Sequence, residues 1–427
     1  MTTTVGDQPK TKFTLTPRQK KMWPILILGI FFEGFDDACI NIVLPFISKD
    51  FQLTSQMAGY ALSVIAIGTM FAFFIVRMAD NIGRRPIFLW SVYLYSICSL
   101  LSAFAPNMYV LVALQFLARI FLIGCWSVGY VIISEEFSTE HRGRAVGLFQ
   151  LTAVFGALLL ALLLPVVNSL GLNWRAFYVI GALPLIPALI FNKNLPETLR
   201  FLKLQEEKKA GIKQPKTDFF AVWRHPYTKY VVIMSLVWVF LYFGIKGSLN
   251  FFTLRMVKEL SWTPNMISLA LVTQTAMSLL IIGFNGRLMD KIGRKRAALL
   301  IITLGSISAA LVFTLKDFTA ILIVGLFSAG FVNSFLIVAS TLTNELFPTE
   351  LRSNAMAWTN NIMGRMGQVM VPTLVGTMTL WMGLGQAVTI AVLMPFIALV
   401  LIMVFLPETS TLARQADLQE AKQGASQ

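Results

Sequence analysis

The sequence predicts an all-α membrane protein with twelve transmembrane helices in two pseudo-symmetric bundles of six. Three observations support this fold class. Hydrophobic residues make up 56% of the 427 residues and charged residues only 13%, and the mean hydropathy is +0.71. Such values exclude a soluble globular domain of this size. Twelve apolar runs are each long enough to cross about 30 Å of hydrocarbon, and charged motifs recur after a constant interval.

The twelve apolar runs form two sets of six. The first set lies at about residues 22–48, 55–76, 86–105, 109–134, 143–167 and 174–192. The second set lies at about residues 230–254, 264–286, 296–315, 318–343, 353–378 and 381–406. Residues 193–229 are the only long polar connection and separate a first bundle, 22–192, from a second, 230–406. Residues 1–21 and 407–427 form polar tails.

Each half of the sequence contains one copy of two charged motifs. One is an Asp-x-x-Gly-Arg loop after the second and eighth runs; the other is a glutamate seven residues before an arginine. Their residues in the first half are Asp80, Gly83, Arg84, Arg85, Glu135 and Arg142. Those in the second half are Asp290, Gly293, Arg294, Glu345 and Arg352. Because 290 − 80 and 345 − 135 both equal 210, the two motifs indicate duplication of a half-length unit.

The net charge of +14 is explained by the orientation of the protein in the membrane and not by nucleic-acid binding. Of the 35 lysines and arginines, 27 lie in the two tails and in alternate loops. Those on the other side are Lys49, Arg175, Arg255, Lys258 and Lys316. This asymmetry predicts that both termini and the basic loops are cytoplasmic. We therefore expect a multi-pass protein of the cytoplasmic membrane, with the lipid bilayer as its surroundings and without a nucleic-acid partner.

Together these features resemble the major facilitator superfamily over about residues 20–410. The resemblance also rests on the Pro-Glu-Thr sequences at 196–198 and 407–409, which end the two halves. Within it, Glu33-Gly34-Phe35-Asp36 is similar to the Asp-Gly-Tyr-Asp of aromatic-acid and other metabolite–proton symporters, and residues 196–202 are similar to the Pro-Glu-Ser-Pro-Arg-Trp-Leu of sugar porters and animal organic-ion transporters. The resemblance implies two bundles that rock around a central site. It also implies that the loop motifs act as gates, braced by charge-assisted hydrogen bonds in the outward-facing state.

Six charged residues fall inside the predicted spans, where each ionised group costs at least ~2.5 kcal/mol. They are Glu33, Asp36, Asp37, Arg119, Lys246 and Arg365. The three acids share one helix face because they stand at i, i+3 and i+4, and such crowding favours a proton-coupling site. The resemblance gives Asp36 the leading role, since it matches the second Asp of the symporter motif. It also makes Arg119 the counter-ion, as an arginine of helix 4 pairs with the helix-1 Asp in proton-coupled sugar porters.

The repeat places Lys246 at the position equivalent to Asp36, since 36 + 210 = 246. Two interpretations stay open: Lys246 binds an anion while Asp36 handles the proton, or the two neutralise each other across the cleft. Arg365 lies between Gly364 and Gly367 and is similar to an arginine of helix 11 in the metabolite symporters and organic-ion transporters. A guanidinium is suited to binding a carboxylate. The other interpretation of Arg365 is a structural pairing with a neighbouring helix.

Polar and aromatic side chains in the predicted cavity helices are weaker candidates for substrate binding. The polar ones are Gln150, Gln274, Asn333, Asn360 and Asn361. Each can equally join neighbouring helices. The aromatic ones are Trp126, Tyr130, Phe243 and Trp358. These side chains either stack a planar substrate or serve as ordinary packing.

The sequence therefore predicts a monomeric secondary active transporter that carries a small organic anion by alternating access. Protons are the expected coupling ion, and no cofactor or metal is expected. Three alternatives remain: proton-driven efflux of an amphipathic drug or siderophore-like compound, transport of a sugar or organic cation, and a receptor with a transporter fold. An enzyme is not expected, because His141 and His225 lie in predicted loops and no Cys–His, metal-ligand or P-loop spacing appears.

Overall fold

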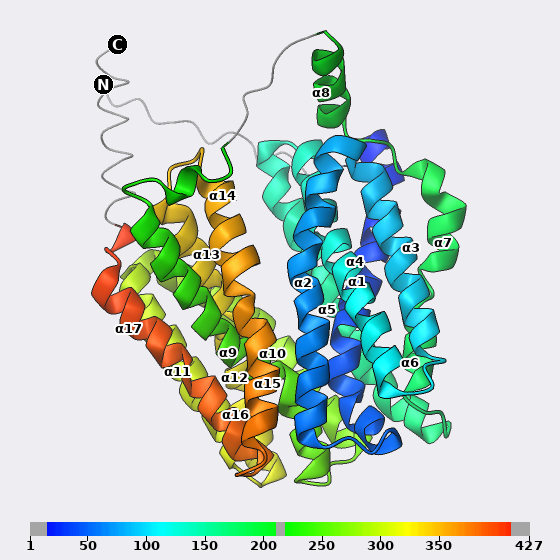
Figure 1. The fold of residues 1–427 in the computed structure, drawn as a ribbon, viewed down its shortest axis with the longest axis vertical. Helices are drawn as coiled ribbons and strands as arrows, with labels where there is room; N and C mark the ends of the chain where they lie inside the picture. Colours follow the sequence, from blue (N-terminus) through cyan, green and yellow to red (C-terminus); the bar gives the residue numbers. More distant parts are fainter. Residues whose placement is uncertain (1–14, 211–217, 411–427) are drawn as a thin grey trace, which may run out of the picture.

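The computed structural model describes residues 15–210 and 218–410, and every regular element in these ranges is a helix (Figure 1). The first half contains α1 (Pro17–Asp50), α2 (Ser55–Ile82), α3 (Arg84–Ser102), α4 (Met108–Glu136), α5 (Thr139–Ser169), α6 (Arg175–Gly181) and α7 (Leu185–Phe191). The connection contains η1 (Asn192–Asn194), α8 (Leu199–Lys209) and η2 (Ala221–Trp223). The second half contains α9 (Thr228–Lys258), α10 (Pro264–Ile292), α11 (Arg294–Thr314), α12 (Phe318–Asn333), α13 (Phe335–Leu346), α14 (Arg352–Met356), η3 (Ala357–Gly364), α15 (Met366–Met378), α16 (Leu384–Leu393) and α17 (Pro395–Phe405).

The twelve predicted spans correspond to these helices, so the predicted all-α membrane fold is confirmed. Eight helical stretches in the described ranges are long and apolar enough to cross a bilayer by length and composition alone. The other four spans are charged or interrupted: α1 carries three acids, α3 begins with two arginines, α6 and α7 are separate, and η3 divides the eleventh span. The break before α7 follows from Pro184, which has no N–H to donate to the preceding turn.

The two halves meet chiefly through three helix pairs, α2 with α15, α5 with α10 and α1 with α9. In the α2–α15 contact, Gly59 lies against the backbone of Pro372 and Gly376 so closely that a side chain at residue 59 would collide with it. The Ser63 hydroxyl donates to the carbonyl of Val369 at 2.6 Å. These contacts lie near the start of α2. They join the halves tightly at one end of the molecule.

The charged loops lie at the other end of the molecule. We call the end that carries Asp80 and Asp290 the motif end and the opposite one the far end. At the motif end the side chains of Asp80 and Asp290 are 69% and 73% exposed. At the far end, Lys258 of the second half donates to the carbonyl of Leu53 of the first half at 3.0 Å. The halves are therefore closed against each other at the far end, with α2 and α15 side by side there (Figure 1).

Candidate functional site

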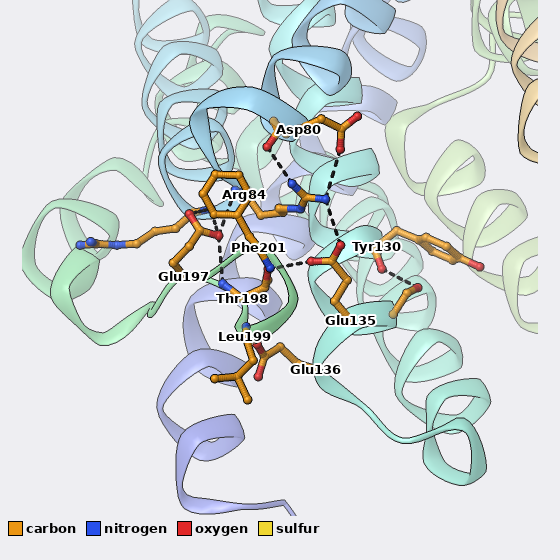
Figure 2. A network of polar contacts seen from close by, with 12 residues as sticks. Asp80, Arg84, Tyr130, Glu135, Glu136, Glu197, Thr198, Leu199 and Phe201 are labelled. Atoms are coloured by element: carbon orange, nitrogen blue, oxygen red, sulfur yellow. Dashed lines mark hydrogen bonds and ion pairs between the residues drawn. The ribbon is translucent and has the colours of Figure 1, made fainter. Parts of the chain in front are cut away.

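Arg84 is the centre of a polar network at the motif end of the first half (Figure 2). Its guanidinium lies 3.1 Å from Glu135 and 3.2 Å from Asp80. The second oxygen of Glu135 accepts a hydrogen bond from the Thr198 hydroxyl at 2.7 Å. Gly83 has a φ of +121°, a conformation that favours glycine, and it makes the sharp turn from α2 into α3. The loop motif and the Pro-Glu-Thr sequence thus form one network.

Glu197 caps the start of α3. The helix begins directly after Gly83, which has no side chain with which to satisfy the first N–H groups. The Glu197 carboxylate accepts from the backbone N–H of Arg84 at 3.0 Å and of Arg85 at 3.2 Å. A carboxylate at this position is stabilised by the free N–H groups and by the helix dipole. The Pro-Glu-Thr sequence, which on sequence alone only marks the repeat, supplies a long-range helix cap.

The second half repeats this construction. Arg294 lies 2.7 Å from Glu345 and 2.8 Å from Asp290. Glu408 accepts from the backbone N–H of Arg294 at 2.7 Å and of Lys295 at 3.0 Å. The Thr409 hydroxyl donates to Glu345, as Thr198 does to Glu135 in the first half. The duplicated motifs therefore build duplicated three-dimensional networks.

The glutamates of the second motif bond the arginines of the first motif. Glu135 and Glu345 each bond the arginine of the Asp-x-x-Gly-Arg loop, and not the arginine that follows seven residues later. Arg142 is exposed, and Arg352 donates to the carbonyl of Phe347 at 3.2 Å. The physical reason is that each glutamate lies near the end of its helix facing the loop, whereas each arginine follows the turn into the next helix.

Glu408 offers a pH-dependent test of the capping contact. Burial raises the pKa of its carboxylate, but hydrogen bonds from the Ser410 hydroxyl and from the backbone N–H of Arg294, Lys295 and Ser410 outweigh burial and hold the pKa below its ordinary value of 4.5. Because the folded-state pKa is lowered, this stabilisation is present at neutral pH and is lost as the pH falls below that value. We expect Glu408→Gln to lower the melting temperature of the purified protein at pH 7 by about 1–3 °C.

The difference in melting temperature between Glu408→Gln and the wild type should stay constant from pH 7 to 5 and shrink as the pH is lowered from 5 to 3. Glu350→Gln is the matched control, because Glu350 is exposed. Its melting temperature should follow that of the wild type at every pH. A difference for Glu408→Gln that stays constant down to pH 3, or an equal effect of Glu350→Gln, contradicts the capping role.

The three acids of α1 have three different surroundings. Asp37 forms an ion pair with Arg119 of α4. Asp36 is fully buried and accepts a hydrogen bond from the Ser99 hydroxyl of α3 at 2.7 Å. Its second oxygen, Oδ2, has no hydrogen-bond partner among the residues that the structure describes. Glu33 is 6% exposed and interacts electrostatically with Arg119 and Lys246.

Two expectations about Asp36 are changed by these positions. Asp37, and not Asp36, is the acid that pairs with Arg119. Asp36 lies in the interior of the first half, where Ser99 bonds both its carboxylate and the carbonyl of Tyr178. Among the acids, Glu33 is the one that interacts electrostatically with Lys246. In this conformation the structure does not show Asp36 and Lys246 neutralising each other.

Three cations from different helices form a cluster near the middle of the molecule. Arg119 of α4 interacts with Arg365, which lies between η3 and α15, and Lys246 of α9 interacts with both. Arg365 donates to the carbonyl of Thr69 on α2 at 2.9 Å, which joins the two halves. Its Nε has no hydrogen-bond partner among the described residues. Arg119 also interacts with Asp36 and Glu33 and forms an ion pair with Asp37, so three acids of α1 face the three cations. Among the described residues, neither Lys246 nor Arg365 forms an ion pair of its own.

The helix that precedes Arg365 is wound as a π-helix over η3. The N–H of Arg365 bonds the carbonyl of Asn360, five residues earlier, at 3.0 Å. The Tyr242 hydroxyl of α9 donates to Asn360 Oδ1 at 2.8 Å. π-helical turns are rare and often occur at functional sites. This turn was not predicted, because hydrophobic spacing does not distinguish it from an α-helix.

The remaining polar candidates divide between the interior of the halves and their surfaces. Gln274 is buried, and its amide nitrogen lies against Gly325 without a hydrogen-bond partner among the described residues. Asn333 donates to the Ser278 hydroxyl at 3.3 Å, which joins α12 to α10. Gln150 is exposed and Asn361 is partly buried. In this conformation Asn333 therefore joins two neighbouring helices.

The four aromatic candidates also have separate surroundings. Trp126 and Tyr130 of α4 stack with ring centroids 6.0 Å apart. Phe243 is buried and packs against Phe240, with centroids 6.1 Å apart. Trp358 donates its Nε1–H to the carbonyl of Phe219 at 2.9 Å. Trp358 is thus bound to the connection between the halves, and the expectation that it stacks a substrate is not supported by this position.

Comparisons with known proteins agree with this architecture. The sequence model of the Major Facilitator Superfamily matches residues 26–256 and 238–425. The chain is 25% identical to the niacin transporter NiaP of Acinetobacter baylyi (83% of this chain, 85% of that protein) and 26% identical to the gallate transporter of Pseudomonas putida (85% and 86%). The inward open structure of the xylose transporter XylE from Escherichia coli is similar in fold, with a TM-score of 0.72 at 19% identity (90% and 96%). Because the family model matches nearly the whole length of this chain, the chain belongs to the Major Facilitator Superfamily.

Proposed function

We propose that this protein is a proton-coupled secondary transporter that carries a small organic carboxylate across the cell membrane. The cation cluster is the observation that supports this proposal. Arg119, Lys246 and Arg365 converge from helices of both halves, and whereas Arg119 pairs with Asp37, neither Lys246 nor Arg365 forms an ion pair among the described residues. Because like charges repel at close range, a bound anion lowers the energy of such a cluster. The substrates named for the two relatives, niacin and gallate, are both carboxylic acids.

The proposed orientation follows from the distribution of basic residues, which places the motif end in the cytoplasm. The far-end contacts of Gly59 and Lys258 then close the outer side, so the conformation is inward-facing. In the proposed cycle these contacts break, and the loop networks of Arg84 and Arg294 approach the opposite half. Glycine at residue 59 allows the close contact that the inward-facing state requires.

Lys246 and Arg365 are proposed to bind the substrate carboxylate between the halves. Their positions suit this role. Lys246 belongs to α9 of the second half, and Arg365 donates to α2 of the first half, so an anion bound by both side chains is linked to both halves. Asp36 is proposed to carry the proton. A buried carboxylate with an unpaired oxygen is costly when ionised, and a bound proton removes that cost.

The substrate class is tested by thermal shift of the purified protein with matched ligands. Nicotinate and nicotinamide share a ring, but only nicotinate carries a negative charge. We expect nicotinate, gallate or another small carboxylate to raise the melting temperature, and the neutral amide and organic cations to leave it unchanged. Stabilisation by nicotinamide equal to that by nicotinate, or by cations alone, contradicts a carboxylate site.

A further inference from the structure

The end of the connection between the halves is bound to the second half through Trp358. The side chain of Asn354 donates to the carbonyl of Asp218 at 3.1 Å, and Trp358 Nε1 donates to the carbonyl of Phe219 at 2.9 Å. The ring of Trp358 also contacts the rings of Phe219 at 5.0 Å and Phe220 at 5.3 Å between centroids. Two hydrogen bonds and these ring contacts fix the backbone and the ring of Phe219 on helix α14–η3.

The ring of Phe219 also reaches the first half. Its centroid lies 5.5 Å from that of Phe73, and the guanidinium carbon of Arg77 lies 5.8 Å from the Phe219 centroid. Phe73 and Arg77 both belong to α2, and Arg77 stands three residues before Asp80 of the loop motif. Phe219 therefore contacts both halves near the motif end.

The two helices that Phe219 joins are those that close the far end. The start of α2 packs on α15 through Gly59 and Gly376, and α15 continues the helix of α14 and η3. When the halves rock, the far ends of these helices separate and their motif ends approach each other. The motif-end distance between α2 and α14 thus changes during the cycle, while Phe219 contacts both helices in the present conformation.

We propose that Phe219 is a latch that stabilises the conformation closed at the far end. Trp358 holds the ring on the second half, and the ring holds α2 through Phe73 and Arg77. Aromatic pairs and cation–π contacts each contribute modestly. Removal of the ring should therefore shift the ratio of the two conformations by roughly three- to tenfold toward closure at the motif end.

The chain contains a matched control in the neighbouring residue. Phe220 has the same side chain, contacts Phe219 and Trp358, and is 60% exposed. Among the described residues, its ring contacts are all with the connection and the second half. Phe220→Ala removes an equal amount of aromatic surface from the same segment and leaves the Phe219–Phe73 contact in place.

The test measures the distance between spin labels at the motif end by double electron–electron resonance. The labels are attached to Ile82→Cys at the end of α2 and Glu350→Cys before α14, both exposed positions. Cys39, Cys98 and Cys125 are buried, and labelling of the unmodified protein gives their background. We expect Phe219→Ala to move population from long to short distances and Phe220→Ala to leave the distribution as in the wild type.

An unchanged distribution for Phe219→Ala, or an equal change for Phe220→Ala, overturns the latch. If Phe219→Ala does not fold, Phe73→Ala removes the same contact from the other half. It should give the same shift, and its failure to do so also overturns the proposal. The latch rests on the alternating access of the proposed function but not on its substrate. A shift in distances without carboxylate stabilisation would retain the latch and reject the substrate class.

Discussion

Asp36→Asn is expected to abolish proton-driven accumulation of substrate while leaving substrate binding and exchange partly intact. The substitution keeps the size of the side chain and an oxygen that can accept from the Ser99 hydroxyl, so the contact of α1 with α3 is retained. It removes the group that we propose gains and loses the proton. The measurement is uptake into proteoliposomes with an imposed pH gradient, followed by exchange of labelled for unlabelled substrate without a gradient.

Asp37→Asn is the control that separates proton transfer from ion pairing. It removes the ion-pair partner of the buried guanidinium of Arg119, which is destabilising, although less so than for a fully buried pair because the Asp37 side chain is 36% exposed. Asp37→Asn should therefore lower the melting temperature, whereas Asp36→Asn should not. Full accumulation by Asp36→Asn at wild-type stability would refute the proton-carrying role of Asp36.

Lys246→Ala and Arg365→Ala are expected to weaken binding of the substrate carboxylate by about ten- to a hundredfold each. This range corresponds to the loss of one hydrogen bond to a charged group. The dissociation constants would be measured by calorimetric titration of the purified variants. Lys49→Ala is the matched control, because Lys49 is an exposed lysine at the far end of α1. Normal binding by both Lys246→Ala and Arg365→Ala contradicts the anion site.

The fold could be predicted because its signals are local or periodic. The apolar runs mark the spans, and the 210-residue interval marks the halves; the observed helices follow both. The networks of Arg84 and Arg294 repeat in space as their residues repeat in sequence. Duplication preserves contacts within each half, so residues that recur at one interval were informative about structure.

The site was less predictable, because it depends on which way each side chain points. Asp36 and Asp37 are adjacent, yet about 100° of helix rotation separates them, and of the two only Asp37 forms an ion pair with Arg119. The resemblance to the symporter motif could not decide between them. The capping role of Glu197, the π-helix at η3 and the binding of Trp358 to the connection all depend on contacts that sequence spacing does not encode.

Uptake of a small carboxylate under an imposed pH gradient is the measurement that tests the proton-coupled transport of an organic anion most directly. Proteoliposomes containing the wild-type protein would be assayed with acidic exterior, with equal pH, and with acidic exterior plus a protonophore. We predict accumulation above equilibrium only in the first condition, and none there for Asp36→Asn. Carboxylate uptake that is indifferent to the gradient would contradict proton coupling, and absence of carboxylate transport in every condition would contradict the substrate class.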